Sequence, residues 1–226
     1  MHNRRVVFFL DYANINRAAS DQGIELDYGE LLEYMGEGRF LVDAHVYVPV
    51  DPRNEHRLDG LIDRLWSEGY VVHRKVGVPL QDSYKCDFDV EITIDVLNTV
   101  YQVKPDIIVL GTGDGDFSPL VREVRRLGVR VEVASFTSSA SRDLTLRSSG
   151  FVSLDAYVQE ALHAMYPEQT VDPQNESTDP ERGDESVEAV LASDGSINEA
   201  EAEPQPPADP NTAVLRTPRI PSADDY

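Results

Sequence analysis

The chain has 226 residues, with 41 acidic against 20 basic side chains and a formal net charge of −21. Such a balance excludes nucleic-acid binding by global charge alone, because that affinity rests on cationic groups that neutralise phosphates. The single cysteine, Cys86, excludes an internal disulfide framework and is typical of a reducing compartment. No apolar run reaches the 18 residues of a membrane span, so we expect a cytoplasmic protein without membrane contact.

The composition changes near residue 167, which predicts one domain followed by a tail. Residues 1–166 carry almost all the aromatic and β-branched side chains, whereas residues 167–226 hold 15 acidic and three basic residues and one aromatic ring. A chain of that composition cannot bury enough apolar surface to offset its conformational entropy, so we expect a disordered acidic tail. Residues 215–221 are more apolar and are a candidate docking peptide for a protein partner; a featureless terminus is the alternative.

Along the domain, short apolar segments alternate with helical patterns, which predicts an α/β fold with a mostly parallel sheet. The predicted strands are residues 6–10, 42–48, 71–76, 107–110, 129–134 and, more weakly, 151–154. The predicted helices are residues 28–35, a segment that begins with the cap Asp51-Pro52 and stops at Gly69, and residues 88–101, 119–127 and 155–165.

Three loops of the predicted domain carry carboxylates at one edge of the sheet. Asp11 ends the first strand, Asp87 and Asp89 open the helix after the third, and Asp114 and Asp116 follow the fourth. The carboxyl ends of parallel strands meet at one edge, where functional groups gather. Burying unpaired carboxylates is costly, and hard divalent cations choose carboxylate oxygens. The pattern therefore predicts a Mg²⁺ or Mn²⁺ site.

Each of these acids also has a purely structural interpretation. Asp89 fits a helix N-cap, Asp11 fits a turn residue, and Asp114 and Asp116 fit a glycine-rich loop with an Asp cap. The convergence of three loops on one edge favours the metal site over three independent turns.

The helix at residues 88–101 has one polar stripe formed by Asp87, Glu91, Asp95 and Asn98. Its other positions are apolar almost all round, which predicts a buried helix. An acidic stripe on a buried helix must face a site or a partner, and Asp95 is its strongest candidate. The alternative is a stripe that faces solvent.

The segment Gly111–Gly115 superficially resembles a phosphate-binding glycine loop, but that signal is weak. Two carboxylates in the loop would repel phosphate, so we interpret the glycines as allowing a tight turn at a metal, with Thr112 offering a hydroxyl. Basic side chains at the same edge are candidates for phosphate contacts. These residues are Arg17, Lys85, Arg142 and Arg147.

Four segments resemble the NYN domain, in the LabA-like branch of the PIN-like nucleases. They are FFLDYANI, KCDFDVEITIDVL, VLGTGDGDFSPLVREVRRLGVRVEV and SRDLTLRSSGFVSLD, and the resemblance covers roughly residues 4–160 in order and spacing. It implies a three-layer α/β/α sandwich and a ribonuclease that uses Mg²⁺ or Mn²⁺. The implied substrate is RNA.

The resemblance also implies roles for individual residues. The implied catalytic residues are Asp11, Asn14, Asp89, Thr112, Asp114 and Asp116. The implied metal ligands are Asp11, Asp89, Asp114, Asp116 and Asp95. Thr112 stands where the family usually has serine, which preserves the hydroxyl. An extra residue and an extra Asp in the segment 85–89 leave open whether Asp87 or Asp89 is the ligand.

Two other functions are compatible with the sequence. A non-catalytic regulatory module would keep the fold and bind RNA or protein, with the tail recruiting partners. A haloacid-dehalogenase-like phosphatase also places an Asp after the first strand, but it needs a second Asp two residues later, where this chain has Ala13. The oligomeric state, a homodimer included, stays open.

Overall fold

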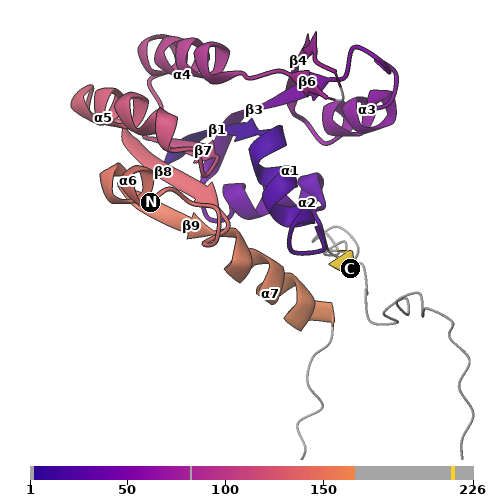
Figure 1. Cartoon of the computed structure of the whole chain (residues 1–226). Helices are drawn as coiled ribbons and strands as arrows, with labels where there is room; N and C mark the ends of the chain where they lie inside the picture. Colours follow the sequence, from indigo (N-terminus) through magenta and orange to yellow (C-terminus); the bar gives the residue numbers. More distant parts are fainter. Residues whose placement is uncertain (1–2, 82, 166–214, 217–226) are drawn as a thin grey trace, which may run out of the picture. The chain divides into compact units, whose positions relative to one another are not determined.

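Six parallel strands form the central sheet of the molecule (Figure 1). The computed structural model describes residues 3–81, 83–165 and 215–216. In sheet order the strands are β4 (Val71–Val76), β3 (Phe40–Val50), β1 (Arg5–Asp11), β7 (Ile107–Gly111), β8 (Arg130–Ser135) and β9 (Gly150–Ser153). All five neighbouring pairs are parallel, which confirms the predicted fold class.

The central strand β1 is buried on both faces, as its continuous apolar sequence predicts. Val6, Phe8 and Leu10 point into one core, while Val7 and Phe9 point into the other. Alternation of successive side chains across the sheet produces this division. The sheet therefore separates two hydrophobic cores.

Helices cover both faces of the sheet and complete the predicted three-layer sandwich (Figure 1). One core contains residues of α1 (Tyr12–Ser20), α2 (Tyr28–Gly36), α3 (Asp59–Ser67) and α7 (Leu154–Met165). The opposite core contains residues of α4 (Asp89–Gln102), the 3₁₀ helix η1 (Gly115–Phe117), α5 (Ser118–Arg126) and α6 (Arg142–Arg147).

Two small strand pairs lie outside the main sheet. β5 (Val78–Pro79) and β6 (Tyr84–Lys85) form an antiparallel hairpin. β2 (Ile24–Glu25) pairs in parallel with β10 (Leu215–Arg216). Apart from those two residues, the predicted tail lies outside the described residues, and its expected disorder stays a prediction.

The structure corrects the predicted start of the helix that ends before Gly69, which is α3. Residues 51–58 form turns and α3 begins at Asp59, so the cap predicted at Asp51-Pro52 is wrong. The Asp51 carboxylate instead accepts hydrogen bonds from the backbone N–H and the guanidinium of Arg53. The predicted stop is confirmed, because Gly69 has a φ of +98°.

The first helix was not predicted because no loop separates it from β1. Asp11 is both the last residue of the strand and the N-cap of α1, where its carboxylate accepts a hydrogen bond from the Asn14 N–H at 3.2 Å. An N-cap at the end of a strand starts the helix at once.

The prediction that α4 is buried all round is wrong. Val90, Ile94 and Tyr101 are 65%, 52% and 60% exposed, and only one face of the helix enters the core. The middle of the polar stripe contacts the neighbouring strands, since Lys75 Nζ of β4 lies 2.6 Å from Glu91 Oε1 and the Tyr47 hydroxyl of β3 donates to Asp95, whereas Asp87 and Asn98 at its ends are exposed. No helix in the described part of the chain is long and apolar enough to cross a membrane.

Candidate functional site

The predicted carboxylate edge coincides with the topological switch point of the sheet. From β1 the chain adds β3 and β4 on one side and then returns to place β7 on the other side of β1. Ligands of open α/β sheets bind where the strand order reverses in this way. The end of β1, where Asp11 caps α1, and the loop after β7, which carries Asp114, therefore lie side by side.

Hydrogen bonds fix the start of α1 against the loop after β7. The Gly113 N–H donates to Asn14 Oδ1 at 2.8 Å, and Thr112 Oγ1 lies 3.4 Å from Asp11 Oδ2. The Asp114 N–H in turn donates to Thr112 Oγ1 at 3.2 Å. Asn14 and Thr112, both predicted at the site, thus connect its two halves and orient the Asp11 carboxylate.

Gly113 is required at this position by the approach of a third loop. A side chain there would collide with the backbone oxygen of Ser139 and the hydroxyl of Ser135. The Gly113 carbonyl also accepts a hydrogen bond from the Ser141 N–H at 2.8 Å. The loop after β8 therefore packs directly on the carboxylate loop.

The acidic groups of the site interact electrostatically. The pKa of Asp11 is raised to about 6, first by burial and also by the charges of Asp89 and Asp114, against the opposing hydrogen bonds from the Asn14 N–H and Thr112. The pKa of Asp89 is raised by burial first and then by Asp114, Asp87 and Asp116. Like charges are therefore crowded at the edge of the sheet.

Asp11, Asp89 and Asp114 have the donor chemistry of a hard-cation site, since all of their donors are carboxylate oxygens. Among the described residues, no three His, Cys, Asp or Glu side chains are already gathered at the spacing of a ligand set. Mg²⁺ commonly binds through one or two carboxylates and keeps several waters. A hydrated divalent cation fits this arrangement, because it would relieve the crowding of charge.

The structure does not bring Asp95 to this cluster. Its carboxylate accepts a hydrogen bond from the buried Tyr47 hydroxyl at 2.8 Å and lies 3.9 Å from His73 Nδ1. Asp87 is exposed, and its carboxylate lies 3.8 Å from Lys85 Nζ. Between Asp87 and Asp89, the charge that raises the pKa of Asp11 belongs to Asp89.

The predicted basic residues are distributed unevenly around the site. Arg17 lies in the last turn of α1, about 9 Å along the helix axis from Asp11 at 1.5 Å per residue. Lys85 and Arg142 are exposed, and neither lines a pocket of the site. Of the four, only Arg147 lines a pocket beside the carboxylate loop.

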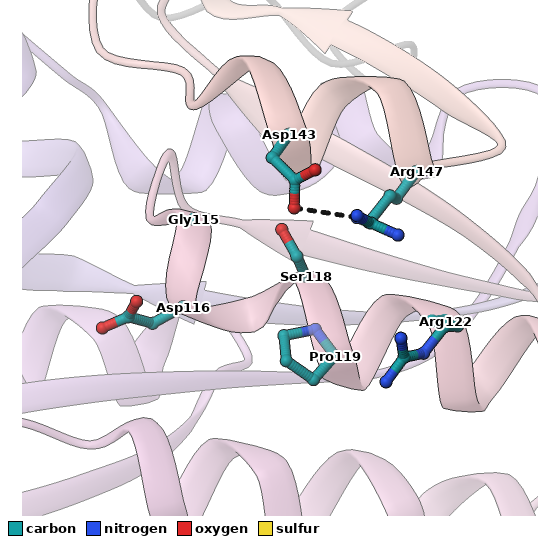
Figure 2. Close-up of a pocket in the computed structure, with 7 residues that line it drawn as sticks. All are labelled: Gly115, Asp116, Ser118, Pro119, Arg122, Asp143 and Arg147. Atoms are coloured by element: carbon teal, nitrogen blue, oxygen red, sulfur yellow. Dashed lines mark hydrogen bonds and ion pairs between the residues drawn. The ribbon is translucent and has the colours of Figure 1, made fainter.

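That pocket, with a volume of about 330 Å³, is also lined by Arg122. Figure 2 shows Arg122 on α5 and Arg147 on α6 facing the same space, with Asp116 at its other end. Arg147 Nε pairs with Asp143 at 2.8 Å. The sequence places Arg122 eight residues after Asp114. That spacing indicates a residue near the carboxylate loop only once the start of α5 at Ser118 is known.

Comparisons with known proteins agree with this architecture. The chain is 30% identical over 161 residues to the low amplitude and bright protein LabA of Synechococcus elongatus, covering 67% of this chain and 84% of that one. It is 26% identical over 129 residues to an uncharacterised protein of Methanocaldococcus jannaschii, covering 57% of this chain and 46% of that one.

A crystal structure of a protein of unknown function from Vibrio parahaemolyticus superposes with a TM-score of 0.58 at 26% identity, covering 68% of this chain and 94% of the other. The family model of the NYN domain matches residues 5–155, a range that contains every strand of the central sheet and all of the carboxylates described above. The chain therefore belongs to the NYN domain family, a family of PIN-like putative nucleases.

Proposed function

We propose that this protein is a ribonuclease that hydrolyses phosphodiester bonds of single-stranded RNA with Mg²⁺ or Mn²⁺. The observation that carries the proposal is the crowding of Asp11, Asp89 and Asp114 at the switch point, with the pKa of Asp11 raised to about 6. A protein keeps charges in such a costly arrangement where a cation compensates them. Membership of a family of putative nucleases supports the same chemistry.

Asp11, Asp89 and Asp114 would hold the cation, with Asp116 at the exposed rim. A bound divalent cation supplies a water of lowered pKa and neutralises charge on the phosphate oxygens. The Thr112 hydroxyl keeps one oxygen of Asp11 oriented, and the Asn14 N–H keeps the other. These contacts hold the carboxylate in one rotamer, which lowers the cost of organising the site.

Arg122 and Arg147 would hold a backbone phosphate on the β8 side of the carboxylates. Asp116 lines the same pocket as both arginines and lies two residues after Asp114, so a phosphate there would lie next to the cation site. Asp116 and Asp143 also line this pocket, and Asp143 pairs with Arg147, so the phosphate contact would come from the two guanidinium groups and not from a basic surface, on a chain with a net charge of −21.

A cleavage assay with the purified full chain tests the proposal. We expect cleavage of labelled single-stranded RNA in Mg²⁺ or Mn²⁺ and none in EDTA. Asp11→Asn and Asp114→Asn should each reduce the rate by at least about 100-fold, since each removes a charge that holds the cation. Asp87→Asn is the matched control and should keep the wild-type rate. Wild-type activity in Asp11→Asn would seat the activity elsewhere, and a folded protein that never cleaves would favour the non-catalytic module.

A further inference from the structure

A second pocket adjoins the carboxylate site on its β3 side, where the sequence predicted nothing. Its volume is about 210 Å³, below the range of typical small-molecule pockets. Its lining includes Tyr12, Asn16, Asp51, Arg57 and Tyr84, and we call it the tyrosine pocket. Tyr12 directly follows Asp11, and Asp51 directly follows β3, so the pocket opens at the same edge of the sheet as the carboxylates.

Two tyrosine rings flank this pocket. Burial raises the pKa of both Tyr12 and Tyr84, and their hydroxyls are close enough for Tyr84 to raise the pKa of Tyr12 further. The Tyr12 ring also packs at 5.5 Å on Tyr28. Tyr84 is held by close packing on Gly77, where any side chain would collide with its ring. Both rings are therefore fixed before a ligand arrives.

The polar groups of the pocket are fixed as well. The Tyr28 hydroxyl lies 3.3 Å from Asn16 Oδ1, which leaves the amide nitrogen as the remaining donor of that side chain. Asp51 is held by two hydrogen bonds from the Arg53 guanidinium, at 2.9 and 2.8 Å. Arg57 is exposed at the rim, close enough to both tyrosines to lower the pKa of each.

We propose that this pocket holds one nucleobase of the RNA strand, next to the phosphate that the carboxylate site receives. A base fits this lining better than a phosphate, because two tyrosine rings flank the pocket and aromatic rings stack on bases of any sequence. The one carboxylate of the lining, Asp51, is already paired with Arg53, and Arg57 is exposed at the rim. The volume suits a single base rather than a whole nucleotide. The inference deepens the proposed function and rests on it for the identity of the strand.

The placement also gives the RNA strand a path. The arginine pocket with Asp116 lies on the β8 side of the carboxylates, and the tyrosine pocket lies on the β3 side. A strand crossing from one to the other would bring a phosphate over Asp11 and Asp114. The stacked base would then position the bond to be cleaved.

The test measures binding separately from cleavage. Fluorescence anisotropy with a labelled single-stranded oligoribonucleotide, in Ca²⁺ and with a gel to show that it stays intact, gives the Kd of the full chain. We expect Tyr84→Ala to weaken binding five- to hundred-fold, the loss of one stacked base. Tyr84→Phe should stay within twofold of wild type. Tyr101→Ala is the matched control, an exposed tyrosine at the far end of α4, and should change nothing.

A second arm locates the base. A set of oligonucleotides, each with one abasic nucleotide at a different position, is titrated against wild type and Tyr84→Ala. One of them should bind wild type with the same reduced affinity that the intact strand shows for Tyr84→Ala. That oligonucleotide should lose no further affinity with Tyr84→Ala, because both changes remove the same contact. If Tyr84→Ala does not fold, Tyr84→Leu fills the space against Gly77 without an aromatic face and takes its place.

The outcomes separate this inference from the proposed function. Undiminished binding by Tyr84→Ala, or wild-type protein without affinity for RNA, overturns the base pocket. If binding depends on Tyr84 and on one base but no metal supports cleavage, the base pocket stands and the ribonuclease proposal falls. If cleavage depends on metal but neither binding nor cleavage depends on Tyr84, the ribonuclease proposal stands and the base pocket falls.

Discussion

Asp11 concentrates the chemistry of the site in one side chain. It is the last residue of β1, the N-cap of α1 and the acid whose pKa is raised to about 6. Asn would keep the cap without placing a charge in this partly buried position. The raised pKa means that the metal-free protein loses stability when this group ionises.

The first prediction follows from the sign of that shift. An acid with a raised folded-state pKa is protonated in the fold and ionised in the unfolded chain between pH 3.8 and about 6, so stability falls as pH rises through this window. Above it the penalty is on the order of 3 kcal/mol. In EDTA, Asp11→Asn should therefore melt several degrees above wild type at pH 7.5, and the gap should shrink towards pH 5.

Thermal denaturation of both proteins across this range measures the effect. A pH-independent gap between wild type and Asp11→Asn would show that the carboxyl group is not the source of the destabilisation.

Gly113 lies where the start of α1, the loop after β7 and the loop after β8 meet. Gly113→Ala should lower stability by about 1–3 kcal/mol and abolish cleavage, because the added carbon meets the backbone oxygen of Ser139 and separates the loops. Gly60→Ala is the matched control: Gly60 lies in α3 with open space around it, so the change should be neutral or stabilise by about 0.5 kcal/mol. Urea denaturation compares the two, and equal stability of both variants would contradict this packing.

The contact between β3 and α4 gives Asp95 a structural role that differs from the one its sequence position suggested. Tyr47→Phe removes a hydrogen bond to a charged group and should lower stability by about 1–2 kcal/mol. Asp95→Asn keeps an acceptor for Tyr47 and should leave the cleavage rate within about twofold of wild type. A loss of cleavage in Asp95→Asn as large as that in Asp11→Asn would place Asp95 among the ligands instead.

Predictions from the sequence succeeded where a single element decided the outcome. The six strands of the main sheet follow from local apolar runs, and the helix predicted at residues 28–35 is α2 of the structure, which confirms both. The start of α3 was missed because the Asp51–Arg53 pair competes with helix capping. The exposure of α4 depends on what packs against it, which local periodicity does not contain.

The site shows the same division. The edge that carries Asp11 and Asp114 follows from parallel strands alone, whereas the separation of Asp95 depends on Tyr47, a residue 48 positions away. The tyrosine pocket joins three segments that are distant in sequence, so no local motif marks it. Long-range contacts decide which predicted residues meet.

For the whole molecule, the net charge of −21 opposes RNA binding, so the affinity for RNA depends on the few arginines that contact phosphate. Arg122→Ala should weaken RNA binding about equally for all sequences and reduce the slope of log Kd against log salt by about one, because one phosphate contact is lost. Arg142→Ala is the control, since Arg142 is exposed and lines no pocket of the site. Anisotropy titrations give both slopes between roughly 50 and 200 mM salt, the range over which such contacts respond. Identical slopes for Arg122→Ala and wild type would contradict the phosphate contact.

The central claim is that the carboxylates at the switch point bind a divalent cation, and calorimetric titration of Mn²⁺ into the full chain at pH 7.5 tests it most directly. We predict saturable binding by wild type and by Asp87→Asn, and its loss in Asp11→Asn and Asp114→Asn, with all four proteins folded. Equal Mn²⁺ affinity in wild type and Asp11→Asn, or no binding by folded wild type at millimolar metal, would contradict the account.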